Sequence, residues 1–209
     1  MNRVLNILYK SLSIVLYPML IPTYGMALFC ASISHNLYPL SVGYGIIVCI
    51  ATLFFTCIIP LGMILMLKKR GAIDSIYLTE RSQRTRPYIY SIAGFGVWCF
   101  FVGNTLHAPL YILWTAIGST AAIVIVAAIN MRWKISAHLC AIGGLTGGIL
   151  SFWMAMGVWP TVTLNVVMLL SLLLMYARIY LNAHTPEQTV AGYITGLVCT
   201  TVPNIIIYA

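Results

Sequence analysis

Seven apolar runs of about 20 residues make up most of this 209-residue chain, and they constrain its fold more than any other feature. They span approximately residues 12–33, 44–67, 88–106, 110–129, 139–157, 161–181 and 189–208. A run of this length with few or no charges is typical of a transmembrane helix, because in lipid the backbone must satisfy its own hydrogen bonds. The sequence therefore predicts an all-α polytopic transmembrane bundle with about six or seven spans.

The composition supports this fold class. Hydrophobic residues make up 61% of the chain and charged residues 7%, whereas an ordinary soluble domain has about 25% charged residues. We expect residues 1–209 to form a single integral membrane domain. Arg3 and Lys10 before the first run could suggest a signal peptide, but Pro18 and Pro22 interrupt the run and no clear cleavage site follows, which favours a retained helix.

The charged residues are distributed very unevenly along the chain. When the seven runs are threaded alternately through a bilayer, all 11 basic and all 3 acidic residues fall on the same side. Under the positive-inside rule this side is cytoplasmic, and a bacterial inner membrane is the location we expect. The net charge of +8 favours contact with anionic lipid headgroups or phosphate rather than nucleic acid, because aromatic residues are not interleaved with the basic ones.

Three polar segments on the charged side could build one site. The first is "YLTERSQRTRPY", where Arg81, Arg84 and Arg86 precede Pro87 at the start of the third run. Three arginines in six residues offer forked donors that match phosphate oxygens. Taken alone, the segment is more typical of a cytoplasmic anchor for a membrane helix.

The second segment is "NMRWKISAHLC", which places Lys134, Ser136 and His138 at the start of the fifth run. Ser136 is a suitable N-cap, and the free N–H groups of the first helical turn would point towards the same aqueous pocket. A functional histidine and an ordinary interfacial one are about equally compatible with this segment.

The third segment is "ARIYLNAHTPEQ", in which Arg178 ends the sixth run and His184 follows six residues later. Thr185, Pro186 and Gln188 then form the pattern of a capping box at the start of the last run. Together the three segments predict a phosphate-binding pocket that contains a nucleophile.

In these segments the chain resembles the type-2 phosphatidic acid phosphatase superfamily, membrane lipid phosphatases related to vanadium haloperoxidases. The family pattern is K-x6-R-P, then P-S-G-H, then S-R-x5-H-x3-D. The matching residues are "RP" at 86–87, "ISAH" at 135–138 and "ARIYLNAH" at 177–184. The resemblance covers residues 79–196, which would form the phosphatase-like core.

The resemblance implies a role for each matching residue. His184 would be the nucleophile that forms a phosphohistidine, and His138 the general acid. The phosphoryl oxygens would be bound by Arg86, Arg178 and Ser136, with Lys134 or Arg84 replacing the motif lysine, whose position is Thr79. No metal or other cofactor would be needed. Gln188 stands where the family has an orienting aspartate, which predicts slower turnover.

The expected function is therefore an integral membrane phosphatase acting on a lipid such as phosphatidic acid, phosphatidylglycerol phosphate or an isoprenoid pyrophosphate. Its partners would be membrane lipids and the lipid-phosphate substrate, without nucleic acid; the oligomeric state stays open. The main alternative is a catalytically impaired relative that binds or moves phospholipids, which Thr79 and Gln188 favour. A transporter is disfavoured because the runs carry no ionisable residue at mid-membrane depth.

Small residues within the runs have simpler interpretations. The six cysteines lie inside or at the ends of apolar runs without a C-x-x-C pair, which is typical of packing residues. The glycines of "GGLTGG" and "GYITG" have small-xxx-small spacing, which predicts close packing between the fifth and seventh runs.

Overall fold

The computed structural model describes residues 3–33, 41–75, 81–155 and 159–208, and within these ranges every regular element is a helix. The α-helices are α1 (Arg3–Val15), α2 (Ile21–Ile33), α3 (Val42–Leu53), α4 (Ile59–Lys69), α5 (Thr85–Phe100), α6 (Leu110–Asn130), α7 (Ala137–Ala155), α8 (Thr161–Tyr180) and α9 (Pro186–Tyr208). Three short elements join or extend them: η1 (Phe54–Ile58), η2 (Ser82–Arg84) and η3 (Phe101–Thr105). The expected all-helical fold is confirmed for these residues.

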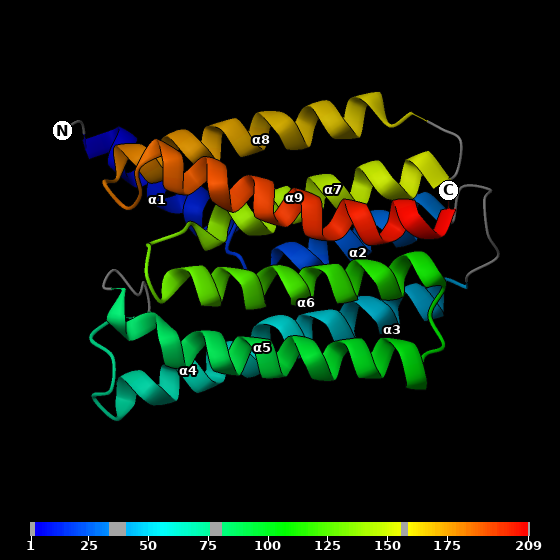
Figure 1. The fold of residues 1–209 in the computed structure, drawn as a ribbon, viewed down its shortest axis with the longest axis horizontal. Helices are drawn as coiled ribbons and strands as arrows, with labels where there is room; N and C mark the ends of the chain where they lie inside the picture. Colours follow the sequence, from blue (N-terminus) through cyan, green and yellow to red (C-terminus); the bar gives the residue numbers. More distant parts are fainter. Residues whose placement is uncertain (1–2, 34–40, 76–80, 156–158, 209) are drawn as a thin grey trace.

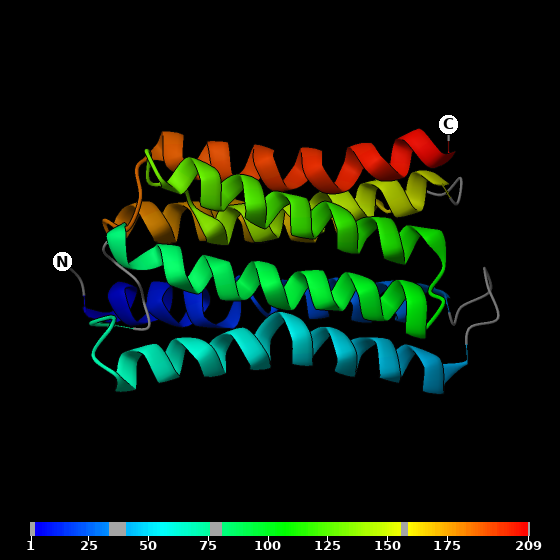
Figure 2. The same cartoon turned by 60° about the horizontal axis from the view of Figure 1, so that its bottom comes forward.

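The helices lie side by side with their axes roughly aligned (Figures 1 and 2). Four helical stretches are long and apolar enough to cross a membrane: Val42–Lys69, Leu110–Asn130, Thr161–Tyr180 and Pro186–Ile206. Two further apolar stretches, Ile21–Ala31 and Ala137–Trp153, are shorter. Two pairs of consecutive helices pack on each other, α5 on α6 and α7 on α8.

The prediction of one continuous helix over residues 12–33 is wrong. The chain leaves α1 after Val15 and enters α2 at Ile21. Pro18 lies in the break, and its ring and missing N–H are incompatible with the interior of an α-helix. The break has a consequence for the site, because it leaves backbone groups near the end of α1 without helical partners.

The second run is continuous over Val42–Lys69, but it contains the π-helical segment η1. This wider turn comes just before Pro60, which cannot donate a backbone hydrogen bond to the preceding turn. A second π-helical segment, η3, extends α5. The chain therefore stays helical through both π-helical segments.

The close packing predicted for the fifth and seventh runs is confirmed between α7 and α9. A Cβ added at Gly143, Gly192 or Gly196 would collide with a backbone carbonyl of the opposite helix: Tyr193, Ser136 and Cys140, respectively. Only glycine permits this approach. The seam holds the amino-terminal ends of α7 and α9 together.

Candidate functional site

The three polar segments converge at one end of the bundle. Figure 1 shows the start of α1, the α4–α5 connection, the α6–α7 connection and the α8–α9 turn at its left side. The opposite end carries the α5–α6 connection and the carboxyl terminus. Every charged residue that the structure describes belongs to α1 or to the connections and helix ends on the left side.

Two local motifs hold His184 in place. At the end of α8, Ala183 N–H donates to the Arg178 carbonyl (3.0 Å) and Asn182 N–H to the Ile179 carbonyl (2.9 Å), with Asn182 at φ 51°. This is a Schellman motif. The predicted capping box is confirmed immediately afterwards, since Thr185 N–H donates to Gln188 Oε1 (3.3 Å) and Gln188 N–H to Thr185 Oγ1 (3.5 Å).

Gln188 also determines the tautomer of His184. Its Oε1 lies 3.0 Å from His184 Nδ1 and accepts the Thr185 N–H as well. An atom that accepts a backbone N–H is the amide oxygen, so the imidazole nitrogen facing it must donate. Nδ1 therefore carries the proton, and the lone pair of His184 resides on Nε2.

His184 is neutral at ordinary pH. Its side chain is 7% exposed, and burial, followed by the positive charge of Arg84, lowers its pKa to about 3. Arg178 and Lys134 lower the pKa further, whereas the hydrogen bond to Gln188 opposes the shift. A buried, neutral imidazole with a free Nε2 has the state that nucleophilic attack requires.

Ser136 joins the starts of α7 and α9. Its Oγ accepts the Leu139 N–H at 3.4 Å, as expected of an N-cap, and its own N–H donates to the Gln188 carbonyl at 3.2 Å. Ser136 is fully buried. It therefore positions the two helix starts against each other, and it is not among the residues that line the cavity described below.

His138 is held by the end of α1, a contact that the sequence did not predict. Its Nε2 lies 3.2 Å from the Ser13 carbonyl, and the Tyr17 ring packs edge-on against it with centroids 5.9 Å apart. A carbonyl can only accept, so Nε2 carries a proton and donates it to Ser13. In the neutral ring, Nδ1 is then the nitrogen without a proton. Tyr17 N–H bonds to Ile14 instead of Ser13, because α1 ends there, and this makes the Ser13 carbonyl available. Pro18 was the only sequence signal for this arrangement.

Arg84 and Arg178 supply the positive charge of the site. Arg84 is 7% exposed and donates to the Ile135 carbonyl at 3.4 Å. Arg178 Nε is buried and has no hydrogen-bond partner among the described residues. Such a donor is costly to leave unsatisfied, and an anion with several oxygens would satisfy it.

Two other predicted basic residues are placed differently. Arg86 is exposed and does not line the cavity, whereas Arg84, two residues earlier in η2, is buried and lines it. Lys134 is half-buried, and its charge acts on His184, but it lies outside the cavity wall. Thr79, at the motif lysine position, falls outside the described residues. Arg81 binds the Asn130 and Met131 carbonyls at the end of α6.

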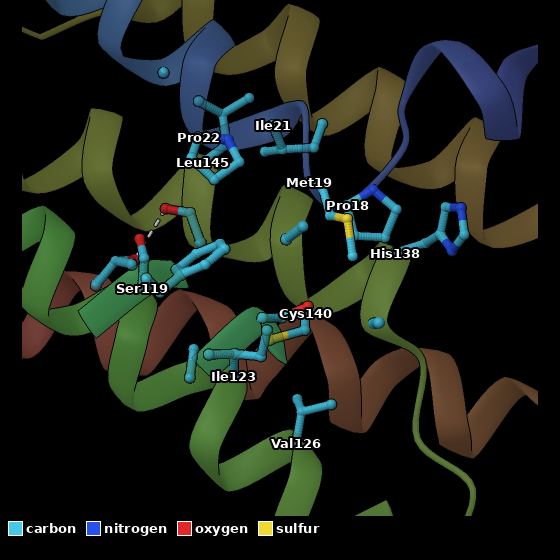
Figure 3. Close-up of a pocket in the computed structure, with 18 of the residues that line it drawn as sticks. Pro18, Met19, Ile21, Pro22, Ser119, Ile123, Val126, His138, Cys140 and Leu145 are labelled. Carbon is cyan, nitrogen blue, oxygen red and sulfur yellow. Dashed lines mark hydrogen bonds between the residues drawn. The ribbon is translucent and has the colours of Figure 1, made fainter. Parts of the chain in front are cut away.

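A cavity of about 160 Å³ connects these residues. Arg84, His138, Arg178 and His184 line one end. The other lining residues are mostly apolar, with Ser91, Thr115, Ser119 and Thr200 as the polar exceptions. In Figure 3, His138 lies beside Pro18 at one edge of the labelled group, with Ser119 towards the other. No described residue of its wall is acidic, so the charged end is suited to an anion.

Neither a metal nor a known relative identifies the site. Within the described ranges, no group of three or more His, Cys, Asp or Glu residues could hold a metal ion. Comparison with protein families, curated proteins and solved structures finds no match to this chain. The functional argument therefore depends on the geometry.

Proposed function

We propose that this protein is an integral membrane phosphatase that removes phosphate from a lipid through a phosphohistidine at His184. The observation that carries the proposal is the pairing of His184 Nδ1 with Gln188 Oε1, which leaves Nε2 as an unprotonated nitrogen in a cavity lined by two arginines. Positive donors fixed around a phosphoryl group stabilise the charge of its transition state.

The proposed reaction has two steps. The Nε2 lone pair of His184 attacks phosphorus, the bond from phosphorus to the alcohol oxygen breaks, and His138 gives that oxygen a proton. Water then attacks the phosphohistidine, His138 takes a proton from it, and inorganic phosphate leaves. Arg84 and Arg178 bind the phosphoryl oxygens throughout.

His138 must carry a proton on both ring nitrogens to act as the acid. Its Nε2 proton is engaged by the Ser13 carbonyl, so the proton given to the leaving oxygen comes from Nδ1 of the imidazolium. The Ser13 carbonyl also stabilises the charged ring. The end of α1 is thus part of the proposed machinery.

For the membrane, we propose seven crossings, with α1 and α2 together as the first. The site then lies on the cytoplasmic side, since the described basic residues gather at that end. Single cysteines that replace Arg132 at the charged end and Val162 at the other would test this orientation. An impermeant thiol reagent added outside intact cells should label only position 162; labelling only at position 132 would contradict it.

The second candidate function is lipid-phosphate binding without turnover. Gln188 favours it, because an amide holds the His184 tautomer without offsetting the positive charge that forms on phosphorylation. Arg84 and Arg178 would serve a binder equally well, whereas a buried histidine with a free Nε2 adds little to binding alone.

Phosphate release distinguishes the two candidates. The detergent-purified protein is incubated with phosphatidic acid, phosphatidylglycerol phosphate, isoprenoid pyrophosphates and simple alkyl phosphates, beside His184→Ala. We expect release from at least one lipid and at least a 10³-fold loss in the variant, as for removal of a nucleophile. Binding of the same lipids without any release would instead support the second candidate.

A further inference from the structure

Tyr88 lines the cavity together with Arg84, and the reaction proposed above gives it no role. It follows Arg84 by four residues at the start of α5, so about one helical turn separates the two side chains. The Tyr88 hydroxyl is hydrogen-bonded to the Arg84 side chain. The tyrosine is 9% exposed, so this polar contact lies inside the bundle.

The direction of this hydrogen bond decides what the hydroxyl can do. A guanidinium has N–H donors and no acceptor, so Arg84 donates and the Tyr88 oxygen accepts. A tyrosine hydroxyl also carries one proton of its own, which Arg84 cannot accept. A bond received from a charged donor polarises the hydroxyl and makes it a stronger donor. The O–H of Tyr88 is therefore a strengthened donor whose acceptor must be another group.

Packing fixes the direction of the phenol ring. Tyr88 belongs to a buried cluster whose members include Val126, Ile135 and Cys140. Ile135 is fully buried, and its carbonyl accepts a hydrogen bond from Arg84 at 3.4 Å. The same residue thus supports the Tyr88 ring and the Arg84 guanidinium. Both donors are held in place before a ligand binds, which lowers the cost of ordering them on binding.

The charges around the cavity favour an anion as the acceptor. Arg84 and Arg178 both line it, and no acidic residue of the described ranges does. Arg178 Nε is buried and has no hydrogen-bond partner among the residues that the structure describes. An oxyanion accepts strong hydrogen bonds from guanidinium and hydroxyl groups alike. A bound phosphoryl group would therefore satisfy Arg178 and Tyr88 together.

We propose that Tyr88 is a further phosphate-binding residue, whose O–H donates to a phosphoryl oxygen while its own oxygen accepts from Arg84. This inference rests on the proposed function for the nature of the substrate, a phosphate ester. Tyr88 and Arg84 act as one unit, because the guanidinium polarises the hydroxyl and holds its oxygen. The unit adds a neutral donor to the two positive ones at the charged end of the cavity.

Tyr88→Phe tests the inference, because it removes the hydroxyl and keeps the ring. Phosphate release from dodecyl phosphate and binding of inorganic phosphate, by isothermal titration calorimetry, are measured on the detergent-purified protein. We expect kcat/KM to fall about ten- to hundredfold and the phosphate affinity at least about fivefold, as for loss of one hydrogen bond to a charged group.

Tyr90→Phe is the matched control. Tyr90 lies two residues further along α5, is half-buried against the cluster of Ile64, Leu67 and Ile73, and does not line the cavity. This variant should keep the wild-type rate and phosphate affinity. A hydroxyl of Tyr88 that only supports packing would lower the melting temperature of Tyr88→Phe and leave the phosphate affinity unchanged, which would overturn the inference.

A double variant tests whether Tyr88 acts together with Arg84. In Arg84→Ala the hydroxyl loses the donor that polarises and orients it. Adding Tyr88→Phe should then lower the phosphate affinity less than it does in the wild-type protein, so the combined loss is smaller than the product of the two single losses. A combined loss equal to that product would contradict their action as one unit.

The inference and the proposed function fail in different ways. Hydrolysis by the wild type, with equal rates and affinities in Tyr88→Phe and Tyr90→Phe, would overturn the role of Tyr88 and leave the phosphatase standing. A faster Tyr88→Phe would do the same, because the hydroxyl would then be masking His184 Nε2. Phosphate binding that Tyr88→Phe weakens, without hydrolysis of any lipid, would overturn the phosphatase and retain Tyr88 as a binding residue. Neither binding nor hydrolysis would overturn both.

Discussion

Replacing Gln188 by glutamate tests how the site activates His184. The two side chains have the same length, so a glutamate oxygen can occupy the place of Oε1, 3.0 Å from His184 Nδ1. Glutamate is also a favoured residue at this position of a capping box. The substitution therefore retains the tautomer and the helix start, and adds one negative charge beside the imidazole.

The size of the effect follows from that distance. An opposite charge this close raises a pKa by roughly one to three units, so the pKa of His184 should rise from about 3 to between about 4 and 6. Each unit is about 1.4 kcal/mol. The same charge stabilises the phosphohistidine cation, so formation of the intermediate should accelerate at least tenfold.

Rapid-quench single-turnover kinetics measure that step directly. The acid limb of the pH dependence of kcat/KM provides a second measurement, because it reports the pKa values of ionisable groups in the free enzyme. In the wild-type protein the limb due to His184 should lie below about pH 5, and in Gln188→Glu it should move upwards. Ionisation of the substrate phosphate contributes equally to both proteins, so the difference between them isolates His184.

Glu187→Gln is the matched control. Glu187 is exposed, and this substitution changes the charge by one at the position next to Gln188. It should change neither the rate nor the limb. Gln188→Asp places a carboxylate on a side chain one methylene shorter and should accelerate the reaction less than glutamate. If Gln188→Glu leaves both the single-turnover rate and the acid limb unchanged, Gln188 acts only as a helix cap and the reasoning is refuted.

Three further predictions follow from the same geometry. Burial holds the pKa of His184 at about 3, below its usual value near 6.5. Below pH 6.5 the unfolded chain therefore binds a proton at this residue that the folded protein does not bind, and the free energy of unfolding decreases as the pH falls from 6.5 towards 3. At pH 5 the loss is about 2 kcal/mol, so the melting temperature in detergent should fall more for the wild type than for His184→Gln; equal falls would contradict this. Arg84→Ala should lower kcat/KM at least 100-fold and Arg86→Ala less than threefold, whereas the reverse order would restore Arg86 to the site. Gly196→Ala should destabilise the protein by several kcal/mol, because its Cβ collides with the α7 backbone, whereas Gly96→Ala meets open space and should be neutral in thermal melting.

The helices and the turn around His184 were accessible from the sequence because their causes are local. Long apolar runs predict helices, and the Thr185-Pro186-Glu187-Gln188 pattern predicts a helix start, which the structure confirms. Glycine spacing likewise predicted the α7–α9 seam. Each of these signals lies within a single apolar run or a single helix start.

Features that depend on long-range packing were not predictable. Arg84 and Arg86 are two residues apart, and only the turn of η2 against Ile135 decides which of them faces the cavity. The contact between His138 and the Ser13 carbonyl joins residues 125 positions apart. It also requires α1 to end before Pro18, where the sequence alone favoured one continuous helix.

The central claim is a covalent phosphohistidine at His184, and trapping it is the most direct test. The purified protein is mixed with dodecyl phosphate labelled with ³²P, quenched in alkali within milliseconds, digested and sequenced. We expect label on the peptide that contains His184, with none in His184→Ala and a larger steady-state amount in Gln188→Glu. Continued phosphate release without label at His184, or release that persists in His184→Ala, would contradict the account.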